Sequence, residues 1–416
     1  MASRDRVINF GAGPSALPQS VLEEASKGLL NFNGTGIGVA EISHRSKEFG
    51  AFLSGLESSI RAQLAVPPTH RILFTQGGGT GQFSAVVYNL LARHRLLYPD
   101  LAEQDRAMHY ILTGSWSKKA AEEARRLGGG RVHVAVDARQ HSADGKSFDN
   151  IPPHDAYDFS TTTTTTTEPA FIYYCENETV DGVQFSPDES SPASLPYGRM
   201  PGAASGKLVP LVGDHSSSFM SRPIPRLAEH AVIYAGAQKN LGPAGLTILI
   251  VREDCLVDVD AAARLGAAPV PITMAYKTLA DSGSLYNTPS VLPIYIAGLV
   301  LERMQKQGGM EAYAAANERK KKKVYAAVAE GAARGVFRAK VKEGSGSWMN
   351  IVFDVLGDGA EKRFLDGAEA HGMKALKGHR SVGGIRVSLY NAITEEQVDR
   401  LIQYMNDFIS EESRQQ

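Results

Sequence analysis

The chain has 416 residues, of which 43% are hydrophobic, so it can bury a large core and form two or three domains. Its 44 lysines and arginines balance 45 aspartates and glutamates. This balance leaves no net field to attract nucleic acid or an anionic membrane, and it argues against a protein that binds either.

The two cysteines, Cys175 and Cys255, form no CxxC pair. This usage fits a reducing compartment and excludes a disulfide scaffold or a cysteine-rich zinc site; we expect no metal. The N-terminal sequence MASRDRVINF has no apolar signal core, and no stretch approaches the ~20 apolar residues of a membrane span. We therefore predict a cytoplasmic protein.

The first sixty residues predict a strand and a helix around two flexible segments. Residues 7–18 suggest a strand followed by Gly/Pro turns, residues 19–30 have helical spacing, and 34–39 (GTGIGV) suggest a loop. His44 and Arg45 then stand side by side near a helix start. Such a pair usually lies on a solvated surface, but an arginine fork can also clamp a carboxylate or phosphate.

Residues 71–83 (RILFTQGGGTGQF) predict a strand, a glycine run and the start of a helix. Glycines at that junction let backbone N–H groups and the helix dipole face an anion, which makes this a candidate phosphate cradle. The segment matches neither GxGxxG nor GxxxxGK[ST], so alone it is a moderate signal.

The segment TGSWS (113–117) repeats the order strand, turn, helix and places Trp116 in the turn. There the indole either fills the core or stacks on a planar ring. Residues 158–168 contain seven consecutive threonines and are interpreted as a surface loop. Residues 171–175 (FIYYC) predict a strand. Thr179, beyond its end, could serve a turn or donate to a ring hydroxyl or phosphate oxygen.

An acid and a lysine follow two further predicted strands. Residues 187–207, rich in Pro, Ser, Gly and Ala, are interpreted as a mobile insertion before the apolar run 208–214 that ends in Asp214. The run beginning at 232 (VIYAGAQKNLGPAG) places Lys239 just past its end. A lysine there either snorkels to water or is desolvated, which lowers its pKa and frees a nucleophilic amine.

Together these two residues suit pyridoxal phosphate chemistry. It needs a Schiff-base lysine and an aspartate that keeps the pyridinium nitrogen protonated, so that the ring can act as an electron sink. Carboxylates at strand ends of an α/β fold point into the crevice where ligands bind. Lys239 and Asp214 match those two roles.

The C-terminal third is more charged. The run 319–323 (RKKKK) starts an Ala-rich helix, on which we expect the cations mostly to face water. In GHRSVGGIRVSLY (378–390), His379, Arg380 and Arg386 gather with little nearby acid. That grouping suggests a dianionic ligand rather than an ion-pair network.

In order along the chain, SHRSKEF, QGGGTGQF, TGSWS, YYCENETVDGV, AGAQKNLGPAGLTILIVRED, LYNTP and GHRSVGGIRVSLYNA resemble the phosphoserine aminotransferases. The resemblance covers nearly the full length and implies an α/β, fold type I pyridoxal phosphate transferase. It would have a large cofactor domain with a mostly parallel central sheet (16–313) and a smaller α+β domain (1–15 and 314–416). The segments near 160–167 and 187–207 would be insertions.

The resemblance also implies roles for individual residues. Lys239 would form the Schiff base and move the proton, Asp214 would hold the ring nitrogen's proton, and Trp116 would stack on the ring. The remaining cofactor contacts would be Thr179 at the ring hydroxyl, Gly79, Thr80 and Gln238 at the phosphate, and, from the other subunit of a homodimer, Asn287 and Thr288. Substrate would be bound by Arg386 at the α-carboxylate and by His379, Arg380 and the other subunit's His44 and Arg45 at the distal anion.

The implied reaction is reversible amino transfer from L-glutamate to 3-phosphohydroxypyruvate, giving O-phospho-L-serine and 2-oxoglutarate in serine synthesis. Two positions depart from the family pattern: Thr80 replaces an arginine of bacterial relatives, and His215 replaces an apolar residue. Two alternatives remain at this point. One is another fold type I aminotransferase for a small 2-oxo acid, and the other is a non-enzymatic binding protein that uses the RKKKK run.

Overall fold

The computed structural model describes residues 7–160, 168–202 and 209–414. The threonine tract 161–167 that we interpreted as a surface loop lies outside the described residues. No helix in the described ranges is long and apolar enough to cross a membrane.

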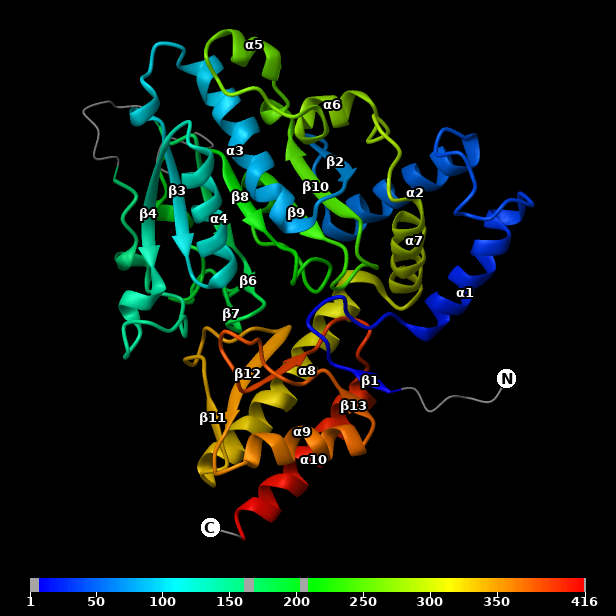
Figure 1. The fold of residues 1–416 in the computed structure, drawn as a ribbon, viewed down its shortest axis with the longest axis vertical. Coiled ribbons are helices and arrows are strands. Elements are labelled where there is room, and N and C mark those ends of the chain that lie inside the picture. Colours follow the sequence, from blue (N-terminus) through cyan, green and yellow to red (C-terminus); the bar gives the residue numbers. More distant parts are fainter. Residues whose placement is uncertain (1–6, 161–167, 203–208, 415–416) are drawn as a thin grey trace.

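A seven-stranded sheet forms the centre of the larger part of the molecule (Figure 1). The strand order is β2-β10-β9-β8-β5-β3-β4; β10 runs antiparallel to both neighbours and the remaining pairs are parallel. The predicted α/β fold class with a mostly parallel central sheet is confirmed. The strands are β2 (His70–Thr75), β3 (Ala107–Leu112), β4 (Arg131–Asp137), β5 (Phe171–Cys175), β8 (Leu211–Asp214), β9 (His230–Gly236) and β10 (Thr247–Arg252).

Alternate side chains of these strands enter two different cores, because a strand presents successive residues to opposite faces. On β2, Ile72 and Phe74 pack into one cluster with α1, α2 and α7, and Leu73 packs on the other side with α3 and α4. Both faces are therefore apolar, which explains the near-continuous hydrophobic runs in the sequence. The helices are α1 (Gln19–Leu30), α2 (Lys47–Leu64), α3 (Gly78–Leu97), α4 (Ser115–Leu127), α5 (Val259–Arg264), α6 (Tyr276–Asp281) and α7 (Val291–Lys306).

The C-terminal part forms a second, smaller layer under the sheet (Figure 1). An antiparallel sheet of order β11-β12-β14 packs with three helices, and β1 from the N-terminus pairs in parallel with β13. The elements are β1 (Ile8–Asn9), α8 (Gly309–Ala333), β11 (Phe337–Ala339), β12 (Asn350–Val355), α9 (Ala360–Ala370), β13 (Met373–Lys374), β14 (Ile385–Ser388) and α10 (Glu395–Glu412).

The hydrophobic core of this layer includes residues from both ends of the chain. Ile8 and Phe10 share one buried cluster with Val324, Phe353 and Phe408. This shared core supports the division that we propose, in which 1–15 joins 314–416 as a small domain beside the large domain 16–313.

Of the segment 187–207, which composition suggested to be mobile, residues 187–202 are packed in the structure and 203–207 lie outside the described residues. Ala193 and Leu195 are buried in the same cluster as Leu211 of β8. Tyr197 lies under the guanidinium of Arg226, 4.8 Å from the ring centre. A few apolar side chains anchor this segment, and the Pro/Ser/Gly composition gave no sign of them.

Candidate active site

Lys239 lies three residues past the end of β9 and lines a cavity of about 210 Å³. Asp214, the last residue of the neighbouring parallel strand β8, lines the same cavity. Parallel strands deliver their C-terminal residues to one sheet edge, which is why the two meet. Seven residues that the sequence singled out reach this cavity: Gly79, Thr80, Trp116, Thr179, Asp214, Gln238 and Lys239.

The Lys239 amine is held by the N-terminal segment of the chain. Its Nζ donates to the backbone carbonyl of Ala12 at 2.5 Å, and Gly13, with φ of 136°, passes close beside it. A Cβ on Gly13 would lie 2.9 Å from Nζ and would displace the amine, and the positive φ of Gly13 also disfavours any other residue there. Burial and, after it, the positive charge of Arg386 lower the pKa of Lys239 to about 8.

Asp214 is buried beside Lys239. Its Oδ1 accepts from the backbone N–H of Ser216 at 2.9 Å. Burial raises the pKa of Asp214, while hydrogen bonds from Ser216 and Tyr234 and the charge of Lys239 oppose that rise. A buried carboxylate of this kind is suited to pair with a cationic ring nitrogen.

The glycine run forms the first turn of α3 and faces the cavity. Gly77 and Gly78 have positive φ angles of 99° and 60°, which bends the backbone from β2 into the helix. The N–H of Gly78 donates to Thr247 Oγ1 at 2.8 Å. The next two N–H groups, of Gly79 and Thr80, have no acceptor inside the helix and lie at its positive end, where an anion is favoured.

Trp116 is fixed by two carboxylates that sequence reasoning missed. Glu178 accepts from the backbone N–H of Trp116 at 2.8 Å and of Ser117 at 2.9 Å. Asp181 accepts from the backbone N–H of Ser115 at 2.7 Å. Burial, and for Glu178 also the neighbouring Asp181, raises the pKa of these two carboxyl groups. Both cap the N-terminus of α4 and so orient the indole.

Arg386, on β14 of the small layer, reaches toward the cavity across the boundary between the two layers. Its Nη1 donates to the backbone carbonyl of Thr179 at 3.2 Å. The Asp181 and Tyr390 side chains are its acidic neighbours, and burial lowers its pKa. Its positive charge is one of the causes that lower the pKa of Lys239.

His379 lies in a cationic neighbourhood after β13. Its pKa is lowered by burial and then by the charges of Arg386, Lys119 and Arg380. Lys119, a residue that we did not predict, also lies over the Trp116 ring, 4.5 Å from its centre. Three cations thus act on His379, and one of them lies over Trp116, which lines the cavity. Such a cationic grouping suits a dianion.

Seven predicted residues do not line the cavity of this single chain. His379, Arg380 and Arg386 come from the small layer, and the other four lie in two turns. His44 and Arg45 lie in the turn before α2, with Arg45 exposed. Asn287 and Thr288 lie in the turn before α7, where Asn287 Nδ2 contacts Gln76 Oε1 at 3.4 Å. These four are the positions that we assigned to the other subunit of a dimer.

His215, the unexplained residue after Asp214, belongs to a buried polar network. The Tyr174 hydroxyl lies 3.0 Å from His215 Nε2 and 2.7 Å from His230 Nε2. His230 Nδ1 lies 3.1 Å from the Arg226 carbonyl and must donate to it, so Tyr174 donates to His230 and accepts from His215. Burial lowers the pKa of His215 to about 4, so it is neutral and serves to anchor the end of β8.

The cationic run 319–323 faces water only in part: the side chains of Arg319 and Lys322 are exposed as expected, and the others are partly or fully buried. Lys320 is buried, and Lys321 lies over the Trp348 ring at 5.0 Å. The other three pair with carboxylates: Arg319 with Glu395, Lys322 with Glu318 and Lys323 with Asp399. The run is therefore no free polyanion-binding patch.

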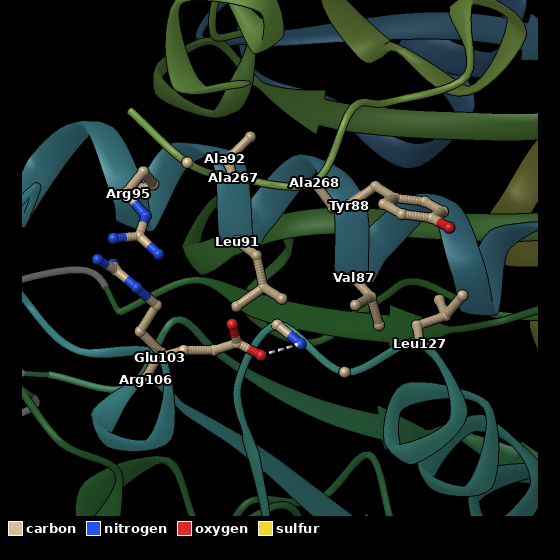
Figure 2. Close-up of a pocket in the computed structure, with 13 residues that line it drawn as sticks. Val87, Tyr88, Leu91, Ala92, Arg95, Glu103, Arg106, Leu127, Ala267 and Ala268 are labelled. Atoms are coloured by element: carbon tan, nitrogen blue, oxygen red, sulfur yellow. Dashed lines mark hydrogen bonds between the residues drawn. The ribbon is translucent and has the colours of Figure 1, made fainter. Parts of the chain in front are cut away.

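A second cavity, of about 280 Å³, lies beside the C-terminal half of α3 (Figure 2). Arg95 and Arg106 lie at one side of it and Glu103 at its floor, where Glu103 accepts from the Gly129 N–H at 3.0 Å. None of the predicted site residues reaches it, so the chemistry belongs to the cavity that holds Lys239.

The residues around Lys239 fit pyridoxal phosphate. The cavity offers an amine of lowered pKa, a buried carboxylate and unpaired N–H groups at a helix N-terminus. These match the aldehyde, ring nitrogen and phosphate of that cofactor in chemical type.

The chain is similar to known proteins over nearly its full length. The family model Aminotransferase class-V matches residues 7–401. A phosphoserine aminotransferase of Nitrosomonas europaea is 39% identical and covers 97% of this chain and 98% of its own length. A solved phosphoserine aminotransferase from Bacillus circulans subsp. alkalophilus is 33% identical, with a TM-score of 0.83, over 98% of this chain and 100% of its own. A PLP-bound one from Trichomonas vaginalis is 32% identical, with a TM-score of 0.80, over 96% of this chain and 100% of its own.

Proposed function

We propose a function from one premise: the chain belongs to the class-V aminotransferase family and, within it, to the phosphoserine aminotransferases. The proposed reaction is reversible transfer of the amino group of L-glutamate to 3-phosphohydroxypyruvate, which gives O-phospho-L-serine and 2-oxoglutarate. Its place would be the synthesis of L-serine. The observation that carries the proposal is the meeting of Lys239 and Asp214 in one cavity lined by the first turn of α3.

Pyridoxal phosphate, when bound, would supply the electron sink for the negative charge that develops at the substrate Cα. Lys239 would hold the cofactor covalently through Nζ and, once released, carry the proton to and from the substrate Cα. A pKa of about 8 suits that task, because a base near the working pH is both available and strong enough.

The other cofactor contacts divide between ring and phosphate. Asp214 would pair with the ring nitrogen, Trp116 would stack on the ring and Thr179 would meet the ring hydroxyl. The phosphate would be bound by the N–H groups of Gly79 and Thr80, by Gln238 and, from the other subunit, by Asn287 and Thr288.

The substrate anions would be bound at the boundary with the small layer. Arg386 would pair with the α-carboxylate, since it contacts the backbone of Thr179, which lines the cavity. His379 and Arg380 would bind the distal phosphate or γ-carboxylate, and Lys119 adds a cation that the sequence did not reveal. A lysine there would offset the loss of the arginine that Thr80 replaces.

A homodimer in the cytoplasm completes the proposal. His44 and Arg45 do not line the Lys239 cavity of their own chain, and each would serve the site of the other subunit. Co-expression tests this arrangement: Arg45→Ala and Lys239→Ala chains would each be inactive, but a mixed dimer would keep one intact site. No recovered activity in the mixture would contradict the shared site.

The substrate class is tested by steady-state kinetics with 3-phosphohydroxypyruvate and L-glutamate. We expect ping-pong kinetics, and Arg380→Ala should raise KM for the phosphorylated substrate, with Arg334→Ala on the far end of α8 as control. If wild-type protein instead preferred an unphosphorylated 2-oxo acid, and Arg380→Ala had no effect, the alternative aminotransferase would be correct.

A further inference from the structure

Lys320 on α8 is 2% exposed and donates to three backbone carbonyls. Its Nζ lies 2.9 Å from the Leu389 oxygen, 3.1 Å from that of Tyr390 and 2.9 Å from that of Ile393. All three belong to the turn that follows β14. A buried lysine is costly unless its amine is fully bonded, so this position needs an explanation beyond packing.

The geometry requires the ammonium form of Lys320. Three acceptors take three N–H donors, whereas a neutral amine has two and would leave one buried carbonyl unpaired. Burial lowers the pKa of Lys320 to about 7, and the nearby carboxylate of Glu395 opposes that shift. The ammonium therefore cross-links one face of α8 to the turn.

The turn held by Lys320 contacts the residue next to the catalytic lysine. The N–H of Asn391 donates to Asn240 Oδ1 at 2.9 Å, and Asn391 Nδ2 donates to the Met220 carbonyl at 2.8 Å. Asn317, one turn before Lys320 on α8, donates to Asn391 Oδ1 at 2.9 Å. One helix thus anchors the turn at two points.

Tyr390 carries the connection to the Lys239 amine. Its hydroxyl donates to the Ala12 carbonyl at 3.0 Å, and this carbonyl is also the acceptor of Lys239 Nζ. The amine lies 5.9 Å from the centre of the Tyr390 ring, which covers it on that side. A shift of Tyr390 would change both the acceptor and the water exclusion of Lys239.

We propose that Lys320 is a positioning residue for Lys239: its three hydrogen bonds fix the 389–393 turn, and the turn keeps Tyr390 on the Ala12 carbonyl that holds the catalytic amine. The inference rests on the proposed function only for the role of Lys239. The series of contacts from Lys320 through Tyr390 to Ala12 does not depend on which substrate is bound.

Loss of the Lys320 side chain should raise the pKa of Lys239. Without its three bonds the turn relaxes, Tyr390 leaves Ala12, and water reaches Lys239, whose other titratable neighbours are Arg386, Asp214 and Cys175. Asp214 and Cys175 keep their places, because they lie on β8 and β5. Arg386 lies on β14, which leads into the turn, and its displacement would remove a charge that lowers the pKa of Lys239, so it would act in the same direction. Loss of desolvation alone moves the pKa of a lysine back up toward about 10.4.

The test compares Lys320→Met with Lys322→Met, two residues further along α8, whose side chain is exposed and pairs with Glu318. Competitive acetylation of the full chain without cofactor, read by peptide mass spectrometry over a pH series, gives the pKa of Lys239 in each protein. Kinetics of the cofactor-loaded proteins follow. Lys320→Gln, which keeps two donors, is the second variant in case Lys320→Met does not fold.

We expect Lys322→Met to match wild type. Lys320→Met should raise the Lys239 pKa and lower kcat by about tenfold to a hundredfold, with KM for L-glutamate little changed, as a displaced catalytic group does. Lys320→Gln should fall between. If the Lys320 variants melt earlier but keep the wild-type Lys239 pKa and kcat, the residue is structural and the proposal is wrong. Failure of the proposed function would appear separately, as wild-type protein without transaminase activity.

Discussion

The backbone N–H of Trp116 donates to Oε2 of Glu178, 2.8 Å away, so the indole at the cofactor cavity is held by a carboxylate one residue before Thr179. Trp116, which we assign to the cofactor ring, and Thr179, which we assign to the ring hydroxyl, are therefore coupled through the buried side chain of Glu178.

Glu178→Gln should loosen this coupling. The amide cannot accept at both of its ends, so one N–H at the start of α4 would lose its acceptor, at a cost of about 1–3 kcal/mol in the free energy of unfolding. Urea unfolding measures the cost, and a change in tryptophan fluorescence reports the displaced ring. Glu122→Gln, at an exposed site on the same helix, should change neither; equal effects of both variants would refute the role.

A substitution at Gly114 tests the same contact through a steric clash with Glu178. A Cβ there would lie 2.3 Å from Glu178 Cδ, while its φ of −175° suits any residue. Gly114→Ala should therefore destabilise the protein by about 1–3 kcal/mol through overpacking. At Gly55, exposed on α2 with nothing near its Cβ position, alanine should instead stabilise by about 0.5–1 kcal/mol. Thermal unfolding of both variants checks the opposite signs.

The buried His215 should make the stability of the protein fall at acidic pH. Its folded pKa of about 4 lies below its ordinary 6.5, so its contribution to stability is complete above 6.5 and is lost as the pH falls toward about 4. His215→Met should lose less stability than wild type over that window, because it has no proton to take up. Urea unfolding at neutral and acidic pH measures the difference, with His141→Met at an exposed histidine as control. Parallel curves for wild type and His215→Met would contradict the account.

Lys239→Arg keeps the charge but removes the nucleophilic amine. Because proton transfer by a placed base contributes about 10²–10⁴-fold, kcat should fall by at least that range. Lys277→Arg, at a partly exposed site on α6 that pairs with Asp281, should retain full activity. Activity of Lys239→Arg near wild type would show that another residue moves the proton.

Sequence reasoning located the cofactor half of the candidate site because its signals are local. Helix α1 was predicted at its observed bounds, and Asp214 and Lys239 were expected at strand ends, where β8 and β9 place them. Apolar runs followed by polar residues mark such ends in any parallel sheet.

The remaining features depend on contacts between distant segments. Glu178 caps α4 by binding Ser117, which lies 61 residues earlier in the chain. Lys320 binds backbone carbonyls that lie 69 to 73 residues later. Backbone acceptors such as Ala12 leave no trace in side-chain composition. A charge run reads as a solvated face until tertiary packing selects one of its members for burial.

Absorbance of the purified protein tests the central claim most directly, before and after addition of O-phospho-L-serine and then 2-oxoglutarate. The account predicts a yellow band from cofactor bound to Lys239, which falls with the first compound and returns with the second. A band that ignores O-phospho-L-serine but responds to another amino acid would contradict the proposed substrate class, and no band after reconstitution with pyridoxal phosphate would contradict the enzyme itself.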